Sequence, residues 1–276
     1  MNLVRAEILK IRTTSTWWVF GIIMLPLWAL AVLYNWGTAN ISGGVDPAES
    51  GLSADQAEQL RVANEAVNVA TTLYTSGQFL GVLLVMLLGA IIVTNEFFHL
   101  TATTTFLVSP VRERVITAKL IAAILLGLVF WAVTTILNLI VVPFVLHALD
   151  YSAQLGDPAV WRAIGLNALA FALWAIVGVG AGVLIRSQLG ATLTLSIAYV
   201  IGTFGASLVF YLLTQYVADW FSKLQVLVPT TASTLMISGT ELPGNPPRWV
   251  GAVVLIGYAV VTGFLGTLIV RRRDIS

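Results

Sequence analysis

Six long apolar stretches limit what this chain can fold into more than any other feature of its sequence. A helix needs about 20 mostly apolar residues to cross roughly 30 Å of hydrocarbon, and each stretch meets that length. They lie near residues 17–35, 77–95, 117–148, 163–185, 189–214 and 249–270. Because 58% of the residues are hydrophobic and only 10% are charged, a soluble fold has no means of burying this much apolar surface. The sequence therefore predicts an all-α integral membrane protein with six transmembrane helices in one domain, residues 1–276.

The basic residues are distributed unequally between the two sides of these six spans. If the N-terminus is cytoplasmic, ten of the 14 Lys and Arg residues fall on the cytoplasmic side, whereas nine of the 13 acidic residues fall outside. A basic tail, residues 271–276, follows the sixth span. Basic residues mark the cytoplasmic side of a membrane protein. We therefore expect both termini in the cytoplasm and a multi-pass protein of the cytoplasmic (cell) membrane.

Residues 1–16 precede the first span and have the character of an interfacial helix. Val4, Ile8 and Ile11 fall on one helical stripe, which suits a helix lying in the headgroup layer. The charged residues beside this stripe are Arg5, Glu7, Lys10 and Arg12. The alternative is a basic anchor that only sets the topology.

Two long outer loops also contain helix signals. The run from Ser53 to Gln56 matches a capping box and predicts a short surface helix that extends to about Val69. Residues 225–237 are too short to span and too apolar for an ordinary loop. They favour either short re-entrant helices between spans five and six or a lid on the membrane surface.

Three residues stand out inside the spans. Pro143 is expected to bend or end the third stretch, which is too long for one straight span. Asn138 and Asn167 are candidates for lining a substrate path; the alternative for each is a hydrogen bond between helices. The small-residue run from Gly178 to Gly182 permits close packing of helices, either within the chain or between two copies.

Residues able to carry out chemistry are scarce. The chain has no cysteine, and the cores of the predicted spans contain no Asp, Glu, Lys or Arg, the groups that ion-coupled transporters use. Glu96 and His99 form a Glu-x-x-His pair, but a catalytic zinc normally takes three protein ligands. None of the three lysines follows a glycine, so the chain has no P-loop of its own. If the chain performs work, the energy must come from another protein.

The cytoplasmic segment between spans two and three is the main place where such a partner would dock. Aromatic side chains are effective interface anchors, and arginines pair with acidic groups or lipid phosphates. The candidate contact residues are Glu96, Phe97, Phe98, His99, Thr101, Phe106, Pro110, Arg112 and Arg114. The alternative is a solvated loop whose basic residues only set the topology.

Three parts of the sequence resemble one protein family. They are the opening RAEILKIRTT with Trp17-Trp18, the segment EFFHLT followed by Pro110-x-Arg112 and AKL, and VPTTA at 228–232. Each is similar to a motif of ABC-2 type ABC transporter permeases. The resemblance is to their six-span form, common in actinobacteria. Phe98 stands where that family usually has a basic residue, and Leu100 where it usually has glycine.

The resemblance implies an N-terminal elbow helix, a cytoplasmic coupling helix between spans two and three, and re-entrant helices between spans five and six. It also implies two permease chains, identical or related, with cytoplasmic P-loop ATPase subunits that bind ATP and Mg. The chain itself would then hold no cofactor or metal, catalyse no reaction and bind membrane lipid but no nucleic acid. It would export a substrate, for which the apolar spans suggest a drug, a lipid or another amphipathic molecule. The competing hypotheses are a membrane enzyme using Glu96 and His99, and a membrane scaffold that transports nothing.

Overall fold

The computed structural model describes residues 3–45, 51, 53–99, 112–241 and 244–272. Within these residues the chain is helical and contains no strand. Six helical segments are long and apolar enough to cross a membrane, as predicted. The long helices are α2 (Thr16–Gly43), α5 (Gln78–Phe98), α7 (Arg112–His147), α8 (Pro158–Ile185), α9 (Gln188–Tyr216) and α12 (Arg248–Arg272). The shorter elements are α1 (Leu3–Thr13), α3 (Ala54–Ala63), α4 (Ala66–Tyr74), α10 (Phe221–Leu224), η1 (Gln225–Leu227) and α11 (Pro229–Met236).

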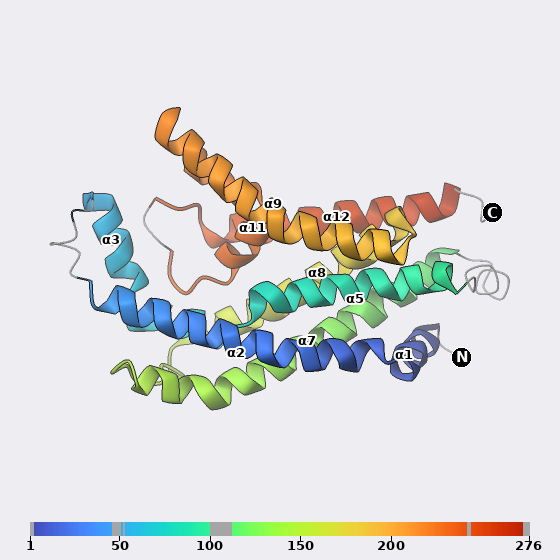
Figure 1. The fold of residues 1–276 in the computed structure, drawn as a ribbon, viewed down its shortest axis with the longest axis horizontal. Helices are drawn as coiled ribbons and strands as arrows, with labels where there is room; N and C mark the ends of the chain where they lie inside the picture. Colours follow the sequence, from blue (N-terminus) through green and yellow to red (C-terminus); the bar gives the residue numbers. More distant parts are fainter. Residues whose placement is uncertain (1–2, 46–50, 52, 100–111, 242–243, 273–276) are drawn as a thin grey trace.

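The long helices run roughly along the longest axis of the molecule (Figure 1). The α1 helix, the last turn of α5 and the described end of α12 lie at one end, on the right of the figure. The α3 helix lies at the opposite end. The described ends of the chain are therefore on the same side of the bundle, as an even number of spans requires.

Two predicted boundaries differ from the structure. The α2 helix continues to Gly43, well beyond the predicted end near residue 35. Pro143 lies inside α7, so it does not end the third span. A proline costs less in a membrane helix than in water-exposed helices, because neighbouring helices and local adjustments satisfy the carbonyl that it frees.

The centre of the bundle is the contact between α5 and α8, which glycines bring close together. A methyl group added to Gly182 would lie 2.7 Å from the backbone carbonyl oxygen of Ala90, and one added to Gly89 would lie 2.6 Å from that of Ala175. Phe171 packs into this contact and is fully buried. The small-residue run on α8 therefore serves packing within the chain.

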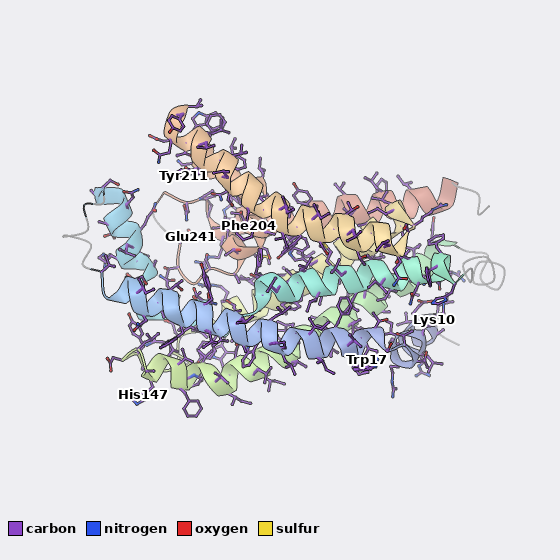
Figure 2. All side chains as sticks on the ribbon, viewed as in Figure 1. Lys10, Trp17, His147, Phe204, Tyr211 and Glu241 are labelled. Carbon is purple, nitrogen blue, oxygen red and sulfur yellow. The ribbon has the colours of Figure 1, made fainter. Side chains whose placement is uncertain are left out.

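The helices α2 and α9 are the least covered by the rest of the chain. Only 11% of the most apolar part of α2 and 6% of that of α9 is buried. Large apolar side chains project from both helices, among them Trp17, Phe204 and Tyr211 (Figure 2). Such surfaces suit contact with lipid or with another membrane helix.

The capping box is confirmed. Gln56 N donates to Ser53 Oγ, and Ser53 N donates to the Gln56 side chain at 3.1 Å. The helix is shorter than predicted, however, because α3 ends at Ala63 and the chain resumes as α4. Residues 225–237 form η1 and α11, and α11 is buried against α12, where Gly251 approaches the carbonyl oxygen of Ala232.

Candidate functional site

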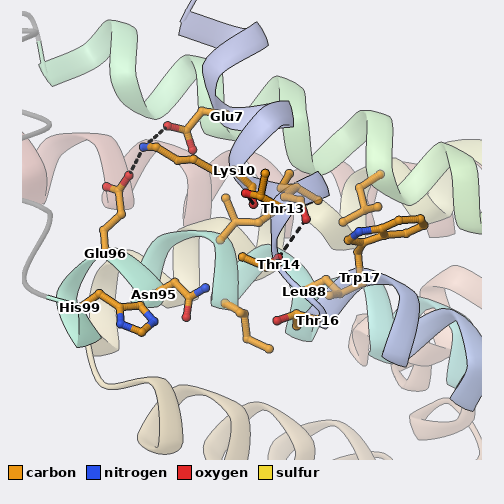
Figure 3. A pocket seen from close by; sticks show the side chains of 14 residues that line it. Glu7, Lys10, Thr13, Thr14, Thr16, Trp17, Leu88, Asn95, Glu96 and His99 are labelled. Atoms are coloured by element: carbon orange, nitrogen blue, oxygen red, sulfur yellow. Dashed lines mark hydrogen bonds and ion pairs between the residues drawn. The ribbon is translucent and has the colours of Figure 1, made fainter.

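Four charged side chains from three helices meet in a closed ring beside α1, here called the charge ring. Glu7 and Lys10 belong to α1, Glu96 to the last turn of α5 and Lys119 to the first part of α7. Lys119 Nζ lies 2.8 Å from Glu7 Oε2 and 2.7 Å from Glu96 Oε1. Lys10 Nζ lies 2.8 Å from Glu7 Oε1 and 2.6 Å from Glu96 Oε1 (Figure 3). Each carboxylate thus lies between two ammonium groups, and the four charges sum to zero.

The sequence places these groups through simple helical geometry. Glu7 and Lys10 are three residues apart, so they share one face of α1. That face lies against α7, and Glu7 is buried while Arg5 and Arg12 remain exposed. The expected helix within residues 1–16 is therefore present, and its polar inner side completes the charge ring.

Three members of the ring are almost inaccessible to water. The exposed fraction of the side chain is 2% for Lys119, 6% for Glu7 and 8% for Glu96, against 48% for Lys10. Removing an ion from water costs several kcal/mol, and only well-placed partners offset that cost. The ring therefore holds α1, the end of α5 and the start of α7 in one arrangement, because separating these helices would leave buried charges without their partners.

The solvent-facing member of the ring is Lys10. Burial alone would lower its pKa, but the hydrogen bonds to Glu7 and Glu96 outweigh burial and raise the pKa above the ordinary value of 10.5. A raised lysine pKa stabilises the fold at every pH below the ordinary value, and this contribution is lost only as the pH rises through the folded-state pKa. Lys10 is therefore fully protonated at neutral pH.

The other predicted contact residues lie where α5 ends. Phe97 is partly buried beneath the guanidinium of Arg186, which is 5.4 Å from the ring centroid. Phe98 is 68% exposed and stacks edge-to-face with His99.

The remaining candidates lie at or before the start of α7. Arg112 is the first residue of that helix, and Arg114 in its first turn is exposed. Thr101, Phe106 and Pro110 lie outside the described residues, so their predicted role stays a prediction.

The pairing of Glu96 bears on the hypothesis of a metal enzyme. Its carboxylate faces two ammonium groups, Lys10 and Lys119, and a cation would have to displace them. Among the described residues, no group of three or more His, Cys, Asp or Glu side chains is placed to hold a metal ion. In the described part of the chain, no third side chain is therefore placed to complete a metal site with Glu96 and His99.

The two asparagines predicted inside the spans differ from each other. Asn138 is 1% exposed, and its amide donates to the carbonyl oxygens of Tyr74 at 2.9 Å and Ser76 at 3.0 Å. Its own oxygen accepts a hydrogen bond from Trp28 Nε1 at 2.7 Å. Asn138 therefore ties α7 to α2 and to the turn between α4 and α5, where Gly77 has a φ of +88°. Asn167 is also buried, and its Oδ1 has no partner among the described residues.

A second feature of the structure, here called the outer cavity, lies in the half of the molecule away from the charge ring. It has a volume of about 720 Å³ and lies between α2, α4, α5, α9 and the end of α11. Its described walls contain no charged side chain. The polar residues in the walls include Asn35, Asn68, Thr72, Gln78, Thr203 and Ser207. The aromatic residues in the walls are Tyr34, Phe79 and Phe204.

Neither feature was predicted from the sequence, although the charge ring had one signal in it. Lys119 lies within the predicted third span, and an ionisable group in a span needs a partner. Glu7 supplies it from 112 residues away, a separation at which no local pattern operates. The outer cavity is lined by hydroxyl and amide groups that come from four or more separate helices.

No protein-family model matches this chain, and no curated protein matches it.

Proposed function

We propose that this chain is the membrane-spanning permease subunit of an ATP-driven exporter of the ABC-2 type, located in the cytoplasmic membrane. It would work with a second permease chain and with cytoplasmic P-loop ATPase subunits that bind ATP and Mg. Both termini would face the cytoplasm, where α1 forms the interfacial helix. Residues 225–237 would lie on the outer side as the re-entrant element.

The charge ring is the observation that carries this proposal. The segment that would receive force from an ATPase runs from the end of α5 to the start of α7. Glu96 and Lys119 stand at the two ends of that segment and are bonded to each other and to α1. A push on the segment would therefore move both spans and α1 together. In this role Glu96 is a positioning residue inside the permease, while the exposed Phe98, His99 and Arg114 are available for contact with the ATPase.

The outer cavity supports a transported substrate and suggests its chemical class. Its volume of about 720 Å³ lies within the range of small-molecule sites. Uncharged walls that combine hydroxyl, amide and aromatic groups favour a neutral amphipathic molecule, because a charged one would lose its hydration without gaining a counter-ion. The cavity adjoins α9, a helix that its own chain leaves largely uncovered.

The first test is purification from native membranes in mild detergent. We expect a P-loop ATPase to co-elute, and we expect deletion of the gene to raise cellular retention of neutral amphipathic dyes. Co-elution without any change in dye retention would favour the scaffold hypothesis instead. If no ATPase co-elutes, the proposed function is wrong.

A second test separates transport from assembly. Ser207→Trp fills the outer cavity, and its neighbour Leu208→Trp is the matched control because Leu208 is 59% exposed and does not line the cavity. We expect both variants to bind the ATPase and only Ser207→Trp to lose dye efflux. Equal efflux by the two variants would remove the outer cavity from the transport path.

A further inference from the structure

A separate cavity of about 480 Å³ lies between α1, the start of α2 and α5, here called the elbow cavity. Its floor consists of apolar side chains of α5 and α7, namely Leu88, Ile91, Ile92 and Leu126. Trp17 at the start of α2 forms an apolar wall. The volume is within the range of sites that bind small molecules.

One end of the elbow cavity is polar. Lys10, Asn95 and His99 line it there, and all three side chains carry N–H groups. The carboxylates of Glu7 and Glu96 also line this end, and each is ion-paired with Lys10 and Lys119. An ammonium group has three N–H donors, and Lys10 uses two of them for Glu7 and Glu96. Its third donor has no partner among the described residues, and the side chain is 48% exposed.

The polar and apolar ends are arranged along the direction of the helices. Figure 3 shows Glu96, Asn95 and His99 at one end of the elbow cavity and Trp17 and Leu88 toward the other, with the hydroxyls of Thr14 and Thr16 beside them. The polar end coincides with the end of α5, and the apolar end lies deeper along the span. A ligand would therefore place its polar group at the membrane surface and its apolar part toward the middle of the membrane, as a lipid in a leaflet does.

Charge favours an anionic headgroup. The charge ring is neutral in itself, but α1 also carries the exposed Arg5 and Arg12, which give the surface beside the cavity a positive excess. Basic residues on an interfacial helix attract anionic lipids. A soluble anion would interact only with the polar end of the cavity, because the cavity floor is apolar.

We propose that the elbow cavity binds one anionic glycerophospholipid. Its phosphate accepts hydrogen bonds from Lys10, Asn95 and His99, and one acyl chain lies along Leu88 and Ile92. The bound lipid fills the space between α1 and α5 and fixes the angle at which α1 leaves α2. This inference concerns a binding site and does not depend on the proposed transport.

Native mass spectrometry of the purified full chain tests the proposal. The probes are phosphatidylglycerol and phosphatidylcholine with identical acyl chains, added at equal concentration. We expect one phosphatidylglycerol to be retained at least about tenfold more than phosphatidylcholine, a difference of about 1.4 kcal/mol. Equal retention of the two lipids would overturn the assigned headgroup site.

Three variants locate the site. Ile92→Trp fills the apolar floor without changing any charge, and Leu193→Trp on α9, where Leu193 is 53% exposed, is the matched control. We expect Ile92→Trp to lose the retained lipid and Leu193→Trp to keep it. His99→Ala should keep a bound lipid and weaken the preference for phosphatidylglycerol. Retention by Ile92→Trp equal to that of the control would show that the lipid binds elsewhere, and an unchanged preference in His99→Ala would exclude its contact with the headgroup.

Discussion

Lys119→Met is the sharpest test of the charge ring, because methionine keeps much of the length of lysine and removes only its charge. In the variant, the carboxylates of Glu7 and Glu96 stay buried, at 6% and 8% exposure, and share Lys10 as their one remaining partner in the ring. Breaking a buried ion pair in this way costs about 3–5 kcal/mol. At roughly 2–4 °C per kcal/mol for a chain of about this size, the melting temperature should fall by about 10 °C.

The second lysine of the ring provides the control. Lys10 is 48% exposed, so water screens its ion pairs, and Lys10→Met should cost only about 1 kcal/mol. The double variant Glu7→Gln/Lys119→Met removes one charge of each sign. It should be less destabilised than the sum of the two single variants by about 1–3 kcal/mol, because the two residues are in contact.

The assay is thermal unfolding in a single detergent, followed by intrinsic tryptophan fluorescence. The melting temperature should be highest for the wild type, lower for Lys10→Met and lowest for Lys119→Met. Equal shifts for the two lysine variants, or an unshifted Lys119→Met, would refute the argument that burial makes Lys119 the central member. Strict additivity in the double variant would show that Glu7 and Lys119 do not interact in solution.

Two further predictions concern packing. Asn138→Leu leaves the indole N–H of Trp28 and two backbone carbonyls without their partner. The free energy of unfolding should therefore fall by about 2–4 kcal/mol, and the melting temperature should fall with it. An unchanged melting temperature would contradict the assigned hydrogen bonds. Gly178→Leu drives a side chain into the backbone carbonyl of Met86 and should abolish monodisperse protein on size-exclusion chromatography, whereas Gly202→Leu has free space and should elute normally. Similar elution of the two variants would be inconsistent with the close contact of α5 and α8.

The number and order of the spans could be predicted because they depend on local properties of the sequence. A run of apolar residues long enough to cross a bilayer must be a helix, since no water is present to satisfy its backbone. The capping box was predictable for the same reason, because Ser53 and Gln56 satisfy each other within one turn. Helix ends were less predictable, since α2 continues past its most apolar part to Gly43.

The candidate site was harder to predict because its members meet only in the folded chain. The sequence pointed to Glu96 as a contact for another protein, but its carboxylate is bonded to Lys10 and Lys119. Asn138 was a candidate for a substrate path, and the structure places it in a hydrogen-bond network that joins three helices. A single polar residue in a span looks the same in either role until its neighbours are known.

The charge ring has a consequence for how the protein is made. The translation machinery releases α1 first and α7 much later, so Glu7 must wait for Lys119 while the intervening spans are inserted. A lysine in a membrane helix resists insertion, and its cost is relieved once an acidic partner is at hand. We therefore expect the N-terminal helix to assist the integration of the third span, and we expect a fusion tag that prevents α1 from folding back to lower the yield of correctly inserted protein.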